Sequence, residues 1–482
     1  MKGEISLPFS RLQLRSTWLI YRQGFKARLR LGSFLKVHQK ALFIGILTHL
    51  FGWNTIIKNM VNEVSKLNST EDLQKQIEKA KAASFQMSVA SETDKNNALE
   101  LIARELLEST GEILEANKKD LEEGRKADLS SSLMDRLTLD ASRITAMASG
   151  LRKVVSLKDP VGKVVDGWMH PRGMQITKVT VPLGVIGIIY EARPNVTTDA
   201  ISLCLKSGNA CVLRGSQQAW NTNLAIMEVV NRALLQSKLP VEAVQYLNDK
   251  SRESAKVLLH ATEQIDLIIP RGGNSLKDFV NANSDIPVLG AGGGICHVYI
   301  DKDADLNKAV EIALNAKTQR PGVCNACETI LVHGSIKDKV LPVLIDELTG
   351  AGVEVIGDAN LEAISPVTPA REEDWSTEYL DLKVSIKVVD NIAKAIEHIN
   401  KYSTGHSDAI ITEDSLAAQM FKRTIDSACV YINASTRFTD GEEFGMGSEI
   451  GISTQKMHAR GPIGLNELCS YKYIIEGSGQ SR

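Results

Sequence analysis

The chain has 482 residues, 43% hydrophobic and 24% charged, with a formal net charge of −2. This is the composition of an ordinary soluble globular protein, long enough for about three domains. Residues 1–60 hold ten Lys or Arg and one acid, so the remainder carries −11, which argues against broad nucleic-acid binding. The seven cysteines are scattered and form no disulfide framework, so we expect a reducing compartment, the cytoplasm.

The first sixty residues differ from the rest. Their apolar run, Ala41–Trp53, is shorter than the ~20 residues that span a bilayer, and it lacks the small-residue cleavage site of a secretory signal. A soluble helical segment opens at Met60. Three interpretations stay open: a dispensable or misassigned extension, an organelle transit peptide, or a membrane-surface anchor. We predict that residues 1–60 form a basic extension outside the fold.

Residues 70–157 are predicted to be helical. Apolar residues recur there at spacings of three and four, and Ser69–Thr70 before two acids is typical of a helix start. Pro160 and Gly162 end this pattern, and Val164–Val181 is a strand–turn–strand candidate. A hairpin of this kind buries little by itself, so we expect it to reach a neighbouring subunit.

From Thr180 onward, predicted strands and helices alternate. The first series runs from the strand that ends at Tyr190 to the strand "IDLIIP" at Ile265–Pro270, and a second series begins near Ile295. Strands about thirty residues apart with helices between them form βαβ units and a parallel sheet. The predicted fold class is α/β, with two doubly wound lobes and a β-hairpin arm.

Two cysteines stand three residues apart in "TQRPGVCNACETILVHGS", Thr318–Ser335. Cys324 follows Pro321-Gly322 in a predicted loop, where α/β proteins place reactive groups, and Arg320 is a cation that could lower its thiol pKa. Cys327 opens an apolar strand and is predicted to pack. A buried, inert thiol remains the structural alternative for any single cysteine. A zinc site would need a second ligand pair, and a thioredoxin-like pair would precede a helix.

Polar residues also follow two buried strands of the first series. In "YEARPNVTTDA", Glu191, Arg193 and Asn195 cluster where a strand ends and a helix begins. The guanidinium and the carboxamide there could bind an oxyanion or a carboxylate. Helix capping by Asn195 or Thr197 is the structural alternative. In "VLRGSQQA", Arg214 and Ser216 end the next strand and suit a ribose phosphate.

Three glycine-rich stretches lie further along. Gly272 and Gly273 follow a strand and open a helix, so their N–H groups could meet a phosphate, or they could form a tight turn. "LGAGGGICH", Leu289–His297, precedes an apolar strand, which favours a loop of close backbone approach over a dinucleotide fingerprint. Phe438–Pro462 is long and without periodicity, which is typical of a functional segment.

Four stretches resemble one enzyme family closely: "VPLGVIGIIYEARPNVTTDAISLCLKSGNACVLRGS", "QRPGVCNACETILVH", "AIEHINKYSTGHSDAI" and "FGMGSEIGISTQKMHARGP". They are similar to gamma-glutamyl phosphate reductases, a branch of the aldehyde dehydrogenase superfamily that acts second in proline biosynthesis. The resemblance covers residues about 61 to 478 and leaves out residues 1–60.

The resemblance implies an organisation of the chain. It implies an NADPH-binding lobe over residues 61–289 with an arm at about 164–181, a catalytic lobe over 290–462, and a C-terminal oligomerisation strand and tail over 463–482. It also implies a homo-oligomer in the cytoplasm that binds no metal, nucleic acid or membrane. Functional association with glutamate 5-kinase, which makes the labile acyl phosphate, would involve a separate chain.

The resemblance also implies roles for residues at matching positions. Cys324 matches the nucleophile, whereas Cys327 falls at a position that is not catalytic, and Asn195 matches the side chain that forms an oxyanion hole with the Cys324 N–H. The cofactor positions are Arg214 and Ser216 for the adenine ribose, Gly272 and Gly273 for the pyrophosphate, and Glu378 for the nicotinamide ribose. Residue type and placement suggest Arg193, Arg320 and Arg460 for the substrate's phosphate and α-carboxylate.

One departure from the wider superfamily bears on the reaction. Hydrolytic aldehyde dehydrogenases carry a water-activating Glu just before the Gly-Gly that corresponds here to Gly292-Gly293, and this chain has Gly290 and Ala291 there. Without that base a Cys324 thioester should hydrolyse slowly. We therefore expect reduction of L-glutamyl 5-phosphate to L-glutamate 5-semialdehyde by NADPH.

Two other functions stay open. The nearer one is a semialdehyde dehydrogenase of the same superfamily that works in the oxidising or coenzyme A-acylating direction, against which the missing Glu argues. The other is a non-catalytic interaction protein on a dehydrogenase scaffold, which the presence of both Cys324 and Asn195 disfavours.

Overall fold

The computed structural model describes residues 54–290, 292–358, 361 and 367–482. The chain divides into two units, Met1–Ser69 and Thr70–Arg482. Of the predicted extension, residues 1–53 lie outside the described residues, as does Ala291. The extension outside the fold therefore stays a prediction.

Five helices precede the first strand in the described part of the chain. They are α3 (Asn54–Met87), α4 (Glu92–Glu108), α5 (Thr110–Lys126), α6 (Ser131–Leu137) and α7 (Ala141–Ser156). The predicted helix start at Ser69–Thr70 is wrong, because α3 runs through it. No Pro or Gly interrupts α3, and a Ser or Thr caps a helix only where the preceding backbone leaves the helical conformation. Ser91 does cap α4, where its hydroxyl accepts the Asp94 N–H.

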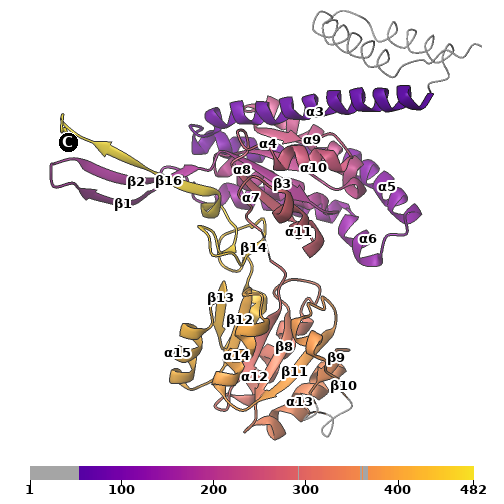
Figure 1. Ribbon diagram of the computed structural model, residues 1–482, viewed down its shortest axis with the longest axis vertical. Helices are drawn as coiled ribbons and strands as arrows, with labels where there is room; N and C mark the ends of the chain where they lie inside the picture. The colour runs from indigo at the N-terminus through magenta and orange to yellow at the C-terminus, as the bar shows by residue number, and fades with distance from the viewer. Residues whose placement is uncertain (1–53, 291, 359–360, 362–366) are drawn as a thin grey trace, which may run out of the picture. The chain divides into compact units, whose positions relative to one another are not determined.

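The first sheet has four parallel strands in the order β5-β4-β3-β6, and its strand β3 is labelled in Figure 1. The strands are β3 (Val185–Tyr190), β4 (Ala210–Arg214), β5 (Val244–Tyr246) and β6 (Leu267–Arg271), and the helices are α8 (Pro194–Lys206), α9 (Trp220–Leu235), α10 (Arg252–Leu259) and α11 (Asn274–Asn283). Every residue of β3 is buried, as in a parallel sheet covered on both faces. The carboxyl ends of the four strands lie along one edge of the sheet.

The second sheet has seven strands in the order β10-β9-β11-β8-β7-β12-β13. The strands are β7 (Cys296–Ile300), β8 (Cys327–His333), β9 (Glu354–Gly357), β10 (Thr368–Pro369), β11 (Lys383–Val389), β12 (Ser407–Ile411) and β13 (Cys429–Ile432), and the helices are α12 (Leu306–Thr318), α13 (Lys337–Gly350), α14 (Ile392–Tyr402) and α15 (Ser415–Thr424). Successive residues of β7 face opposite sides. Val298 and Ile300 join the core beneath α12 and α13, and Tyr299 joins the core beneath α14 and α15. The two predicted α/β series are both present.

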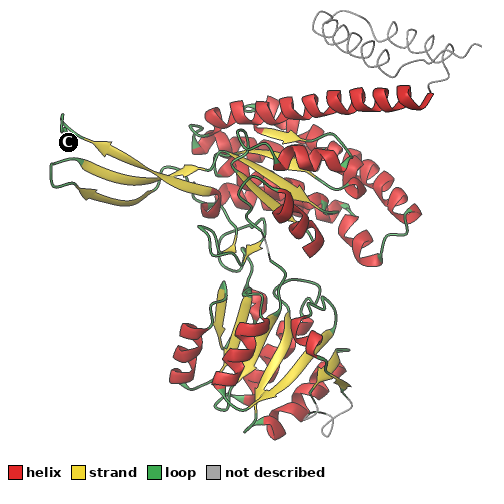
Figure 2. Ribbon diagram, in the orientation of Figure 1, coloured by secondary structure: helices red, strands yellow, loops and turns green. Residues whose placement is uncertain are grey.

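A third sheet is antiparallel and consists of the predicted hairpin and one more strand (Figure 2). The hairpin strands are β1 (Val164–Met169) and β2 (Gln175–Pro182), and β16 (Cys469–Glu476) from the C-terminus pairs with β2 along its whole length. A short pair, β14 (Ile452–Ser453) and β15 (Gly461–Pro462), lies within the long Gly-rich stretch. Among the described helices, none is long and apolar enough to cross a membrane.

Candidate active site

Cys324 lies in the loop between α12 and β8, as the sequence predicts. Its half-buried thiol stands three residues before β8 of the seven-stranded sheet. The Cys324 carbonyl accepts a hydrogen bond from the Cys296 thiol at 3.2 Å. The Cys324 N–H makes no hydrogen bond to any residue that the structure describes, so this donor is available to a ligand.

The loop "LGAGGGICH" supports the backbone of Cys324. A Cβ added to Gly294 would lie 1.4 Å from the Cys324 carbonyl oxygen, so only glycine fits there. The Gly292 N–H donates to the Ile452 carbonyl at 3.0 Å, and the Gly290 N–H donates to Gln455 Oε1 at 3.0 Å. The loop is therefore one of close backbone approach, as the sequence predicts.

Asn325 holds the loop of Cys324 in place, and Cys327 packs in the strand that follows. Asn325 donates to the Thr439 carbonyl at 2.9 Å, and its own carbonyl accepts the Thr436 hydroxyl at 2.7 Å. Cys327 is fully buried in β8, and burial raises the pKa of its thiol to about 12. A thiol so strongly protonated is inert, which agrees with the packing role predicted for Cys327.

Nearby charges oppose each other at the Cys324 thiol. Burial raises its pKa above the ordinary value, whereas Arg271 and Lys277 lower it and Glu449 and Glu378 raise it further. The thiolate is the nucleophilic form, so it depends on these two cations. The sequence suggested Arg320 for this role, but Arg271 is the cation that lowers the thiol pKa most.

Arg193 and Asn195 lie at the start of α8. Arg193 is the N-cap residue without a side-chain capping bond, and Asn195 Nδ2 donates to Asp199 Oδ2 at 3.1 Å. The Thr197 hydroxyl bonds instead to Tyr190 and Asn223. Helix capping by Asn195 or Thr197 is therefore excluded, and the exposed Asn195 amide can turn toward a ligand.

A small cavity of about 40 Å³ opens among these residues. Cations and acids both line it: Arg193, Asn195, Asp199, Arg271 and Glu449 contribute side chains. Burial raises the pKa of Asp199 to about 6 and that of Glu449 to about 7, and desolvation lowers the pKa of Arg193 to about 10. The cavity therefore removes its charged groups from solvent, which is typical of a site that binds a charged ligand.

The other two arginines that are predicted to bind the substrate, Arg320 and Arg460, differ in their contacts. Arg320 is exposed, and no described residue pairs with its guanidinium. Arg460 Nη1 bonds to Asp426 Oδ1 at 2.7 Å, which is the structural ion pair that the residue type also allows. Arg460 would have to leave Asp426 before it could bind a substrate.

The predicted adenine-ribose position has an unsatisfied polar atom. Ser216 is buried, and its Oγ has no hydrogen-bond partner. Arg214 Nη2 donates to the Ser251 carbonyl at 3.1 Å, which holds its guanidinium at the same strand end. A buried orphan hydroxyl is costly, so a ribose or phosphate oxygen fits this position.

The predicted pyrophosphate position already holds a carboxylate. The Gly273 N–H, at the start of α11, donates to Glu191 Oε2 at 3.0 Å. A Cβ on Gly272 would lie 2.5 Å from the Glu191 carboxyl carbon, so the close approach of Glu191 explains that glycine. A helix N-terminus attracts any anion, and a pyrophosphate here would share the site with Glu191.

Glu378 lies between the two lobes' candidate residues. Its Oε1 accepts the Gly294 N–H at 2.8 Å, and its Oε2 would be 2.5 Å from a Cβ on Gly293. Asn274 Oδ1 would be 3.2 Å from the same Cβ. Glu378 therefore abuts both the loop behind Cys324 and the start of α11, where a nicotinamide ribose could meet it.

The sequence placed Glu191 at this strand end without giving it a role, and sequence reasoning missed four other charged residues of the site, namely Asp199, Arg271, Lys277 and Glu449. Arg271 ends β6 just before Gly272, so the argument applied to the ends of β3 and β4 would have found it. Glu449 lies in the long Gly-rich stretch that the sequence marks as functional. No pattern distinguishes the others.

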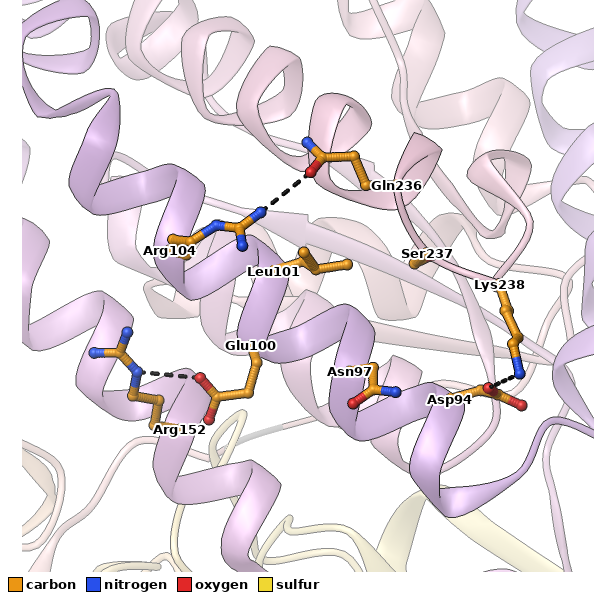
Figure 3. Close-up of a pocket in the computed structure, with 9 residues that line it drawn as sticks. All are labelled: Asp94, Asn97, Glu100, Leu101, Arg104, Arg152, Gln236, Ser237 and Lys238. Carbon is orange, nitrogen blue, oxygen red and sulfur yellow. Dashed lines mark hydrogen bonds and ion pairs between the residues drawn. The ribbon is translucent and has the colours of Figure 1, made fainter.

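A larger surface pocket of about 530 Å³ lies apart from these residues (Figure 3). Its charged side chains satisfy one another at 3.1–3.2 Å, in the pairs Arg104–Gln236, Arg152–Glu100 and Lys238–Asp94. A ligand would have to break these contacts to reach the charged groups of this pocket.

Comparisons with known proteins agree with the fold. Residues 56–384 match the aldehyde dehydrogenase family. A gamma-glutamyl phosphate reductase of Thermoanaerobacter pseudethanolicus is 54% identical over 404 residues, which are 84% of this chain and 98% of that protein. The crystal structure of gamma-glutamyl phosphate reductase from Thermotoga maritima is 48% identical with a TM-score of 0.84, over 85% of this chain and 99% of that one.

A more distant likeness concerns the fold alone. An acetylating aldehyde dehydrogenase from Geobacillus thermoglucosidasius is 16% identical, with a TM-score of 0.62 over 86% of this chain and 98% of that one. The predicted aldehyde-dehydrogenase-like α/β fold is thereby confirmed. At half identity over nearly the whole length of its relatives, the chain is an oxidoreductase that belongs to the gamma-glutamyl phosphate reductases, within the aldehyde dehydrogenase family.

Proposed function

We propose that the protein reduces L-glutamyl 5-phosphate to L-glutamate 5-semialdehyde with NADPH and releases phosphate, as the second step of proline biosynthesis. The observation that carries the proposal is the setting of Cys324: a half-buried thiol beside an unpaired backbone N–H, with Arg271 and Lys277 lowering its pKa. The reductases named among its relatives support this substrate.

In the first step, Cys324 acts as the nucleophile. Its thiolate attacks the acyl carbon, the bond to the phosphate oxygen breaks, and phosphate leaves with the bonding electrons. The Cys324 N–H and the Asn195 amide stabilise the oxyanion that forms on the way. In this step Asn195 exchanges its bond to Asp199 Oδ2 for one to the oxyanion.

The substrate carries negative charge at both ends, and the arginines bind these charged groups. We assign the exposed, unpaired Arg320 to the phosphate, because it precedes Cys324 in the same loop and has no competing partner among the described residues. Arg193, which lines the small cavity with Asn195 and Arg271, takes the α-carboxylate. Arg460 is the weakest of the three candidates, since Asp426 already holds it.

In the second step, the acyl group on Cys324 is reduced and released as the aldehyde. Enzymes of the aldehyde dehydrogenase family use a nicotinamide cofactor, and NADPH, when bound, supplies the hydride. Ser216 and Arg214 would hold the adenosine end, the start of α11 the pyrophosphate, and Glu378 the nicotinamide ribose. The cationic Arg214 beside the unsatisfied Ser216 hydroxyl suits the extra phosphate of NADPH over NADH.

The experiment that tests this function runs the reaction backwards, because glutamyl phosphate is too labile to supply. The protein is incubated with pyrroline-5-carboxylate and NADP⁺, and NADPH absorbance is followed with and without inorganic phosphate or arsenate. We expect NADPH turnover only with phosphate or arsenate. Equal turnover in water would make the protein a hydrolytic semialdehyde dehydrogenase, and turnover with coenzyme A alone would make it an acylating one.

Two variants link the activity to the proposed nucleophile. Cys324→Ala should abolish turnover, whereas Cys327→Ala, which changes a buried side chain in β8, should retain it. If Cys324→Ala stays active, the thiol chemistry is wrong.

A further inference from the structure

We propose that Glu449 binds the α-ammonium group of the substrate and thereby makes the enzyme specific for an α-amino acid chain. The α-carboxylate of the same head group lies against the two cavity arginines, Arg193 and Arg271. This inference rests on the proposed function and adds a specificity-determining residue to it.

Opposite charges share one small cavity without pairing. Glu449 and Arg271 both line it, yet they form no ion pair with each other. Arg271 has no side-chain partner among the described residues, and the same holds for Arg193. A ligand with a negative and a positive group would satisfy both kinds of charge at once, and an α-amino acid head group is such a ligand.

Glu449 is the carboxylate that remains available. Its Oε2 accepts the Gly441 N–H at 2.5 Å, which fixes the side chain, and no described donor bonds to its Oε1. Asp199, the other acid in the cavity, accepts the Asn195 amide. The ammonium group therefore has one free, oriented carboxylate oxygen to bind.

The cavity and Cys324 belong to one electrostatic environment. Arg271 and Glu449 line the cavity, and both act on the pKa of the Cys324 thiol. In glutamyl phosphate only three carbon–carbon bonds separate the acyl carbon from the α-carbon. A head group in this cavity is thus compatible with an acyl carbon at Cys324.

Binding the amine as ammonium also protects the acyl-enzyme. A free α-amine can attack its own thioester carbonyl: a nitrogen–carbon bond forms, the carbon–sulfur bond to Cys324 breaks, the thiolate takes up the proton, and 5-oxoproline leaves. An ammonium group held by the Glu449 carboxylate has no lone pair for this attack. Glu449 would therefore suppress a side reaction that this substrate carries in its own structure.

The test compares two aldehydes in the phosphate-dependent reverse reaction. One is glutamate semialdehyde, supplied as pyrroline-5-carboxylate, and the other is 5-oxopentanoate, which lacks the amino group. We expect Glu449→Gln to reduce the ratio of kcat/KM for glutamate semialdehyde to kcat/KM for 5-oxopentanoate at least about tenfold, because a buried charge-assisted bond is lost. It should also raise the yield of 5-oxoproline per acyl-enzyme. Glu443→Gln, at an exposed position of the same loop, is the matched control and should change neither readout.

The outcomes separate this inference from the proposed function. If wild-type protein shows no phosphate-dependent turnover, the function itself fails. If wild type turns over but Glu449→Gln lowers kcat/KM equally for both aldehydes, Glu449 has a structural role and the inference is wrong. An unchanged ratio with unchanged 5-oxoproline would overturn it as well.

Discussion

At the scale of single residues, the site depends on how a buried thiol is kept reactive. Burial, Glu449 and Glu378 raise the pKa of Cys324, and Arg271 and Lys277 lower it. Arg271 is well suited to this because its guanidinium forms no ion pair with any described carboxylate. The same guanidinium can meet a substrate carboxylate, so thiol activation and substrate binding share one residue.

Arg271→Ala should make Cys324 less reactive. Removing a cation destabilises the thiolate, so the thiol pKa rises and the pH profile of alkylation by iodoacetamide moves to higher pH. The rate at neutral pH then falls, whereas Arg271→Lys, which keeps the charge, should restore most of it. A profile that stays in place in Arg271→Ala would show that this cation does not support the thiolate.

Gly294→Ala should inactivate the protein without unfolding it. The new Cβ would occupy the position of the Cys324 carbonyl oxygen, 1.4 Å away, so the nucleophile loop must move. Displacing a reacting group by about 1 Å costs on the order of a hundredfold in rate. Gly350→Ala is the control, since its Cβ meets no atom within 4 Å. Equal kcat/KM in the two variants would contradict the close approach.

At the scale of elements, α12 and β8 are joined by a buried ion pair just before and after the nucleophile loop. Lys317 Nζ lies 2.7 Å from Glu328 Oε2, and both side chains are 0% exposed. Glu328 Oε1 accepts the Leu380 N–H at 3.3 Å, two residues after Glu378. The pair thus connects the two segments that carry Cys324 and Glu378.

Lys317→Met should destabilise the fold strongly. It leaves the Glu328 carboxyl buried without its cation, and breaking such a pair costs about 3–5 kcal/mol. The free energy of unfolding, measured with urea, should drop by that amount. Lys308→Met removes the exposed pair with Glu413 and should cost less than about 1 kcal/mol. A similar loss in both variants would contradict the argument.

At the scale of the whole molecule, the three-stranded arm has little to pack against within one chain. Its exposed apolar side chains are Val164, Val165, Trp168, Met169, Tyr471, Tyr473, Ile474 and Ile475. The outer strands, β1 and β16, each pair on one side only. Exposed apolar surface beside open strand edges is typical of a protein–protein interface, so we expect a homo-oligomer built through the arm.

Ile475→Asp should weaken self-association. Ile475 is 55% exposed in the single chain, so the substitution costs little there, but it would bury a charge in an oligomer. Light scattering should show a lower mass at equal concentration. Val343→Asp, at 53% exposure on α13, should leave the mass unchanged. If Ile475→Asp has the same mass as wild type, the arm is not the interface.

Much of the fold could be predicted from periodicity. The alternation of apolar strands and helices after Thr180 identified both parallel sheets, and the strand–turn–strand pattern at Val164–Val181 identified the hairpin. The partnership of β16 with β2 joins residues about three hundred positions apart, and no local pattern specifies it. The predicted helix start at Ser69–Thr70 was wrong because Ser and Thr also occur inside helices. Their presence alone does not mark a helix end.

The site could be predicted only where residue type and strand position combine. Cys324, Asn195 and Ser216 follow strands or helices in a way that sequence shows. The carboxylate at the Gly273 N–H comes from Glu191, far away in the chain, and Glu449 enters from an irregular loop. Such contacts depend on tertiary packing, which no spacing rule describes.

The most direct test of the account is a single-turnover experiment on the acyl-enzyme. The protein is mixed with pyrroline-5-carboxylate and NADP⁺ without phosphate, NADPH is counted, and the acid-quenched protein is digested for mass spectrometry. We predict a burst of one NADPH per chain and a glutamyl adduct on the peptide that contains Cys324, which phosphate then discharges. Continuous NADPH formation without phosphate, or an adduct on another residue, would contradict the account.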